Sequence, residues 1–200
     1  MRLHEAIAKY YPEYSDIKHY PAPQCAPIRS TREEWGIFGN FYKTDLLIDG
    51  VTIDCSERLF HLMKFRPDAA EGIRSEFAQP CGMGVKMHMK SVKKHHHEWL
   101  RSEEEWGAMV VDAMRFCLQT KFDQCKAFRE ALAQSKGLFI VEDETARKKE
   151  ADSWGTTLRE AEYVGPNLLG RLLMELRDNN GKLAYALPAD ALDFIRVVKS

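Results

Sequence analysis

The feature that most constrains the fold is a leucine-rich helix pattern between Gly165-Pro166-Asn167 and Asn179-Asn180-Gly181. Proline suits the first helical position, and asparagine or glycine suits the position after the last turn, so the pattern predicts a helix that begins at Pro166. Five leucines recur at helical spacing, which requires one buried face: Leu168, Leu169, Leu172, Leu173 and Leu176. The preceding Asp152-Ser153-Trp154-Gly155 adds a carboxylate and a large flat ring, which beside a helix N-terminus can hold an anion and a ring-shaped group.

Length and composition are those of an ordinary globular chain. The 200 residues suffice for one domain with a core, and 44% hydrophobic with 30% charged residues is typical of such a domain. The formal net charge of -1 gives no general attraction to a polyanion. No run approaches a membrane span, and the N-terminal residues do not read as a signal peptide. Five scattered cysteines without a CxxC pair are typical of free thiols, so we expect a cytoplasmic protein.

The order of the patterns predicts an α+β fold, predominantly helical with a few short strands, in a single domain. We expect a short helix over residues 1–12 and an irregular proline-rich connector over 13–30, together an N-terminal extension. The catalytic domain is expected at 31–181, and residues 182–200 form a C-terminal extension packed on it. Within the domain, the elements expected are a hairpin at 46–53, a strand at 138–142 and helices at 54–66, 69–77, 103–119 and 123–135.

Two segments before residue 70 carry polar groups that could serve a site. Asn40 and Phe41 close an aromatic, glycine-punctuated stretch, which is either core or the wall of a ring-binding pocket. Glu57, His61 and Lys64 recur at helical spacing, so the predicted helix has one polar stripe. That stripe is either a solvated face or a carboxylate and an ammonium group aimed into a cleft.

The segment Lys86–His97 reads KMHMKSVKKHHH and is rich in lysine and histidine. Three adjacent histidines cannot all face one ion from a helix or a strand, so no metal site is predicted there. A basic surface, which could attract a phosphorylated substrate, fits the segment better.

Taken in order, the motifs resemble those of the NADAR family of YbiA-like N-glycosidases. The resemblance covers roughly residues 35–178 and rests on the segments at Phe38–Phe41, Asp49-Gly50, Ser56–Phe65, Asp152–Gly155 and Gly165–Arg177, with Trp106, Met114, Lys121, Phe122, Val141 and Glu142 between them. Arg58 and Leu59 differ from the family's His and Tyr, and Gly39 differs from its Ser. These departures bear on the substrate preference more than on the fold.

The resemblance implies hydrolysis of the C–N glycosidic bond between a ribose and a base, without a cofactor or a metal. Glu57 and Asp152 would be the catalytic carboxylates, because bond cleavage builds positive charge on the ribose. Lys64 would bind phosphate or keep a carboxylate ionised, Trp154 and Phe41 would stack on the base, and Asn167 and Asn40 would make polar contacts to the substrate. We expect the segments that carry Glu57 and Asp152 to face each other across one pocket.

Three functions remain open at this point. The first is hydrolysis of a small phosphorylated ribosyl molecule, an early riboflavin-pathway intermediate such as ribosylaminouracil phosphate, which releases ribose 5-phosphate. The second is removal of ADP-ribose from guanine in nucleic acid, which a near-neutral chain disfavours. The third is a sensor that binds ADP-ribose or a nucleotide without catalysis. Two carboxylates beside an anionic ligand argue against the sensor.

Overall fold

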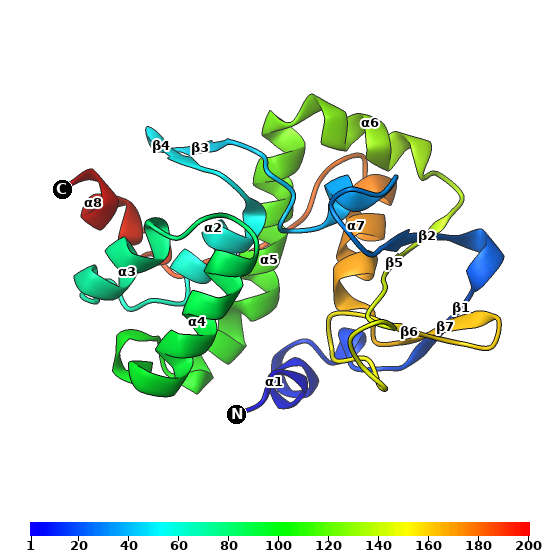
Figure 1. Cartoon of the computed structure of the whole chain (residues 1–200), viewed down its shortest axis with the longest axis horizontal. Coiled ribbons are helices and arrows are strands. Elements are labelled where there is room, and N and C mark those ends of the chain that lie inside the picture. Colours follow the sequence, from blue (N-terminus) through cyan, green and yellow to red (C-terminus); the bar gives the residue numbers. More distant parts are fainter. The chain divides into compact units, whose positions relative to one another are not determined.

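The computed structural model describes residues 1–200, and its elements fall into two units (Figure 1). The first unit comprises Met1–Gly39 and Cys125–Leu183, and the second comprises Asn40–Gln124 and Ala184–Ser200. Helices dominate and all seven strands are short, which confirms the predicted α+β fold. No helix combines the length and the apolar character needed to cross a bilayer.

The first unit contains two small sheets and three α-helices. One sheet has the order β1-β7-β6, all antiparallel, and in the other β2 runs parallel to β5. Its strands are β1 (Lys18–Pro21), β2 (Cys25–Ile28), β5 (Phe139–Glu142), β6 (Thr157–Arg159) and β7 (Glu162–Gly165). Its helices are α1 (Leu3–Tyr10), α6 (Lys126–Gln134) and α7 (Leu168–Asp178), with short 3-10 helices η1 (Pro12–Tyr14), η2 (Ala22–Gln24) and η3 (Gly36–Phe38).

Two segments contain strands that were not predicted. The supposed connector at 13–30 contains β1 and β2, and the residues between Gly155 and α7 contain the hairpin of β6 and β7. Pro21 and Pro27 suggested a connector. Proline is tolerated in edge strands, however, because the side of the strand that lacks an N–H can face away from the sheet. Both β1 and β2 are edge strands. Pairing with distant strands, which local propensity does not report, decides their conformation.

Helix α7 has the predicted buried face, since all five leucines are buried. It begins at Leu168 and not at Pro166, because Asn167 takes the cap position in the left-handed region with φ of 54°. Gly170 lets the helix approach β5 closely. A Cβ atom at this position would lie 2.1 Å from the carbonyl oxygen of Ile140.

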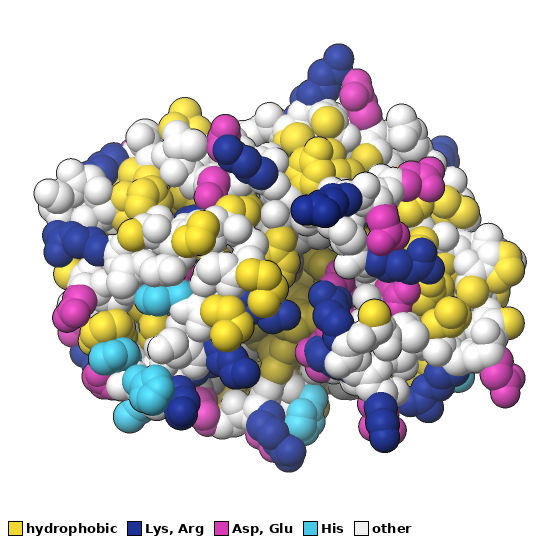
Figure 2. Space-filling model, viewed as in Figure 1, with side chains coloured by type: hydrophobic (Ala, Val, Ile, Leu, Met, Phe, Trp, Pro, Cys, Tyr) yellow, Lys and Arg dark blue, Asp and Glu magenta, His cyan; other side chains and the backbone are white.

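The second unit is mainly helical. Its predicted hairpin is confirmed as β3 (Leu46–Ile48) and β4 (Val51–Ile53), with Asp49 and Gly50 at positive φ in the turn. Its helices are α2 (Ser56–Leu62), α3 (Ala70–Phe77), α4 (Met83–His95), α5 (Glu103–Gln124) and α8 (Phe194–Lys199), with the 3-10 helix η4 (His97–Trp99). On the face drawn in Figure 2, histidine and lysine side chains gather over the end of α4 and over η4.

Helix α2 is shorter than predicted. It ends at Leu62, so Lys64 lies in the turn that follows and not on the helix. Cys55 occupies the cap position without a side-chain cap bond. Asp54 does not cap the helix because its carboxylate pairs with Arg58, at 2.7 Å from Nε and 3.1 Å from Nη2.

Candidate active site

Glu57 lies in the first turn of α2 in the second unit, with its side chain 18% exposed. His61, one helical turn later, places Nε2 3.0 Å from Oε1 of Glu57. Burial raises the pKa of Glu57. The hydrogen bond from His61 and the charges of His61, Lys64 and Lys86 lower it by more than burial raises it, so the pKa lies below its usual value. The side chain is therefore a carboxylate at neutral pH.

Lys64 supplies a half-buried amine whose charge acts on this carboxylate. Its Nζ lies 4.5 Å from the ring centroid of Phe60 and 5.3 Å from that of Trp106. Burial lowers the pKa of Lys64 to about 7, helped by the charge of Lys93 and opposed by Glu57. Near neutral pH this amine can therefore either carry a positive charge or hold a lone pair, and a bound anion would favour the charged form.

Two polar atoms near Glu57 are buried without a hydrogen-bond partner. They are Oδ1 of Asn40 and Oγ of Ser56. The Asn40 amide donates only to the sulfur of Met114, at 3.4 Å, while its backbone carbonyl accepts from the N–H of Glu57 at 3.0 Å. An unsatisfied buried oxygen is costly, and of the two residues only Asn40 keeps some exposure, at 8%, while Ser56 is fully buried. Phe41, the neighbour of Asn40, is half-buried.

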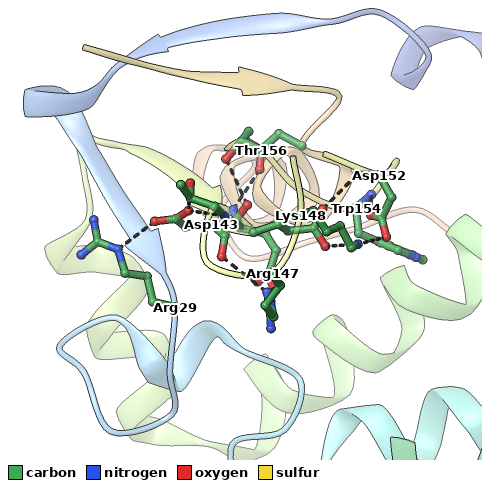
Figure 3. Close-up of polar contacts among 11 residues, drawn as sticks. Arg29, Asp143, Arg147, Lys148, Asp152, Trp154 and Thr156 are labelled. Atoms are coloured by element: carbon green, nitrogen blue, oxygen red, sulfur yellow. Dashed lines mark hydrogen bonds and ion pairs between the residues drawn. The ribbon is translucent and has the colours of Figure 1, made fainter. Parts of the chain in front are cut away.

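In the first unit, Asp152 belongs to a compact ion-pair cluster (Figure 3). Lys148 pairs with Asp152 and, at 2.5 Å, with Glu144. Burial lowers the pKa of Lys148, but the hydrogen bonds to Asp152 and Glu144 outweigh this and raise it above its usual value. Glu144 also accepts the backbone N–H of Asp152 at 3.0 Å, and Asp152 accepts that of Trp154 at 2.9 Å. The cluster fixes the loop that carries both predicted residues, Asp152 and Trp154.

Gly155, the next residue in this loop, must lack a side chain. A Cβ atom there would lie 2.6 Å from Cγ of Glu144 and 2.8 Å from the carbonyl oxygen of Glu142. Figure 3 also shows the ion pair of Asp143 with Arg29, at 2.8 Å, which joins the residue after β5 to the residue after β2. Trp154 is half-buried, so part of its ring remains accessible for stacking.

Asn167 lies in the first unit but is fully buried. Its side-chain amide donates to the carbonyl of Ile140 at 2.9 Å and accepts the N–H of Glu142 at 3.1 Å. These bonds bind the start of α7 to β5. The amide is therefore engaged with backbone, and we do not assign it a contact with substrate.

Asp54, Cys55 and Cys81 form a group with ligand atoms within 4.8 Å of one another. Burial raises the pKa of the Cys55 thiol far above its usual value, so it holds its proton, and Arg58 occupies both oxygens of Asp54. A thiolate and a free carboxylate are what a divalent ion would need, so these residues do not fit a metal site as they stand.

The second unit thus brings together Asn40, Glu57 and Lys64, with Phe41 beside Asn40, while the first unit brings together Asp152 and Trp154. The sequence placed His61 on one polar stripe with Glu57 but did not predict the other partners: Glu76, His88, Glu144 and Lys148. A signal was available for Lys148, which is four residues from both Glu144 and Asp152. Glu76 gives no such signal because it follows His61 by fifteen residues.

The NADAR domain model matches residues 28–179, a range that includes every predicted site residue. This chain therefore belongs to the NADAR family. Among its relatives, the N-glycosidases YbiA of Shigella boydii serotype 4 (strain Sb227) and of Escherichia coli (strain K12) are each 28% identical over 163 residues, covering 81% of this chain and 92% of theirs. The NMR structure of E. coli YbiA is similar with a TM-score of 0.58 and 28% identity, covering 78% of this chain and 84% of that one.

Proposed function

We propose that this protein hydrolyses the C–N glycosidic bond of a small phosphorylated ribosyl molecule and releases the base and a ribose phosphate. An early riboflavin-pathway intermediate, ribosylaminouracil phosphate, is the first candidate. The observation that carries the proposal is the carboxylate of Glu57, which is half-buried, ionised and stabilised by the charge of Lys64. The protein is a hydrolase of N-glycosyl bonds, in line with its N-glycosidase relatives, and the choice of base and phosphate is the proposed part.

The chemistry needs one carboxylate that carries charge throughout the reaction. As the bond between the ribose C1′ and the base nitrogen breaks, its electron pair leaves with the base and C1′ becomes cationic. A fixed carboxylate stabilises that cation or accepts a proton from the attacking water. The water oxygen bonds to C1′, and the proton that it loses balances the proton that the departing base gains. We propose Glu57 for this role and Asp152 for the second carboxylate.

Lys64 suits the phosphate. Its amine has a pKa of about 7, and a phosphate dianion nearby favours the protonated form. Phosphate binding would therefore be accompanied by uptake of a proton by Lys64. The unsatisfied amide oxygen of Asn40 is proposed to accept a hydrogen bond from a ribose hydroxyl. Trp154 and Phe41 are proposed to stack on the base.

Removal of ADP-ribose from guanine in nucleic acid is the second candidate. The observation in its favour is the exposed lysine series on α4: Lys86, Lys90, Lys93 and Lys94. Such a series is suited to phosphate contacts along a strand. A sensor without catalysis is the least favoured, because an ionised carboxylate close to an anionic ligand would weaken binding without any compensating chemistry.

The deciding experiment presents the purified protein with ribosylaminouracil phosphate and, separately, with DNA that carries ADP-ribosylated guanine. Release of ribose 5-phosphate from the first, without release of ADP-ribose from the second, supports the proposal. The reverse selectivity supports the second candidate. Binding of ADP-ribose without turnover of either molecule would support the sensor and overturn both.

A further inference from the structure

A chain of four side chains extends from Glu57 through the second unit. His61 faces Glu57 through Nε2 at 3.0 Å and Glu76 through Nδ1 at 2.8 Å. The other oxygen of Glu76 contacts Nδ1 of His88. Glu76 belongs to α3 and His88 to α4, so three helices contribute to the chain. Glu76 is fully buried, and the side chains of His61 and His88 are 4% and 16% exposed.

The geometry fixes how many protons the chain holds. A neutral imidazole has one N–H donor and one acceptor nitrogen, so it cannot donate to two carboxylates. Both contacts of His61 are hydrogen bonds only when its ring carries two protons or when one of the two carboxyl groups is protonated. Glu57, His61 and Glu76 together therefore hold one proton more than a neutral imidazole between two carboxylates would. When Glu57 is ionised, that proton lies on His61 or on Glu76. Glu76 is shielded from water, so its carboxylate oxygens must accept hydrogen bonds from His61 and His88.

The surrounding charges favour the form in which Glu57 is ionised. Lys64 and Lys86 act on Glu57, and Arg58 acts on Glu76. Arg58 also donates to the backbone carbonyls of Glu76 and Phe77, at 2.6 and 2.8 Å, which holds the end of α3 in place. Cys117 on α5 also interacts with Glu57, but burial raises the pKa of its thiol well above the usual value, so it carries no charge that opposes the carboxylate.

We propose that His61 is a positioning residue that keeps Glu57 ionised and correctly aimed for glycosidic hydrolysis, and that Glu76, backed by His88, in turn orients His61. This inference rests on the role of Glu57 in the proposed function. It adds that Glu76, which does not contact the substrate, influences the reactive carboxylate of Glu57 through the imidazole of His61.

The experiment compares His61→Gln, Glu76→Gln and their double variant with the wild type and with Glu57→Gln. The substrate is ribosylaminouracil phosphate, or ADP-ribosylated DNA if the wild type cleaves only the latter. His19→Gln is the matched control, since His19 also contacts a glutamate, Glu162, at 3.0 Å but on an exposed face of the first unit. Circular dichroism and the thermal unfolding midpoint check that each variant is folded. If Glu76→Gln does not fold, Glu76→Asp, which keeps the charge but shortens the side chain, takes its place.

We expect His61→Gln and Glu76→Gln each to lower kcat by about 10- to 100-fold with little change in KM, as loss of an orienting partner does. The double variant should be no slower than the slower single variant, because Glu76 acts through His61. The acid limb of the pH profile of kcat/KM should move to higher pH in His61→Gln, because the hydrogen bond and charge that lower the pKa of Glu57 are lost. A purely structural role would not move this limb.

The remaining outcomes separate this inference from the proposed function. Full activity of His61→Gln beside an inactive Glu57→Gln overturns the inference alone, and so do multiplied effects in the double variant or an acid limb that stays in place. Full activity of Glu57→Gln, or no turnover of either substrate by the wild type, overturns the proposed function and the inference together. His19→Gln should match the wild type throughout.

Discussion

The imidazole of His61 lies 3.0 Å from the carboxylate of Glu57, one turn away on the same helix. A histidine at this spacing does more than form a surface pair, because both side chains are shielded from water and the interaction is correspondingly stronger. The pKa of Glu57 is lowered despite its burial, and His61 is the largest source of the lowering. A neighbour on the same helix, His61, therefore keeps the carboxylate of Glu57 ionised.

Lys64 should make the stability of the protein depend on pH. Its pKa of about 7 lies below the ordinary 10.5, so between these values the unfolded chain binds more protons than the folded one. Stability due to Lys64 therefore rises as pH increases through this window, and the cost of burying its charge is greatest below pH 7. Lys64→Met removes that cost. Its gain in unfolding midpoint over the wild type should be larger at pH 6 than at pH 9.

The control for this prediction is Lys90→Met, since Lys90 is exposed on α4. Thermal unfolding followed by circular dichroism at several pH values gives the comparison. A difference between Lys64→Met and the wild type that stays constant from pH 6 to pH 9 would show that Lys64 titrates normally.

Lys148 should stabilise the loop that carries Asp152. Lys148→Met leaves Glu144, whose side chain is 7% exposed, without its ion-pair partner. We expect a loss of about 1 kcal/mol in the free energy of unfolding, the scale of a charged hydrogen bond reduced by the partial exposure of Lys148. Because the pKa of Lys148 is raised above 10.5, its contribution is complete below that value and is lost only at higher pH.

Urea unfolding of Lys148→Met at pH 6 and pH 9 tests this, with the adjacent, exposed Lys149→Met as the control. The loss should be equal at the two pH values and absent in the control. A loss that disappears by pH 9, or an equal loss in Lys149→Met, would mean that the cluster of Glu144, Lys148 and Asp152 does not act as described.

Gly170 should be intolerant of any side chain. The added Cβ of Gly170→Ala would lie 2.1 Å from a backbone carbonyl of β5, which cannot move aside as a flexible side chain can. We expect destabilisation of about 3 kcal/mol from overpacking, measured by urea unfolding. In the control, Gly39→Ala, the nearest atom is 3.2 Å away and φ is -65°, so the change should be small. Similar unfolding free energies for the two variants would contradict this close packing of α7 on β5.

The sequence predicted the elements whose stability is encoded locally. The leucines of α7 recur at helical spacing and are buried, and Asp49-Gly50 forms the turn of its hairpin. The strands at 18–21 and 25–28 could not be found in this way, because they are short, contain proline and owe their conformation to partners more than a hundred residues away. The start of α7 was also misplaced, since the left-handed cap at Asn167 depends on bonds to β5.

For the candidate site, the motifs predicted Glu57 and Lys64 as site residues but did not predict the residues that surround them. Glu76 lies on another helix, so nothing within one turn of sequence points to its contact with His61. Asn167 is a different case. Its place before a helix predicts a ligand contact, and in the structure its amide bonds to the backbone of β5. Polar residues at helix starts serve ligands and backbone equally well, and only tertiary structure separates the two uses.

The most direct test of the central claim is the single-turnover rate of Glu57→Gln on ribosylaminouracil phosphate beside that of the wild type and of Asp152→Asn. Glutamine keeps the shape of the side chain and removes its charge. The account predicts that the wild type releases ribose 5-phosphate and that Glu57→Gln is slower on the order of 100-fold or more, the usual weight of a carboxylate that stabilises charge or moves a proton. Undiminished turnover in Glu57→Gln and Asp152→Asn would contradict it.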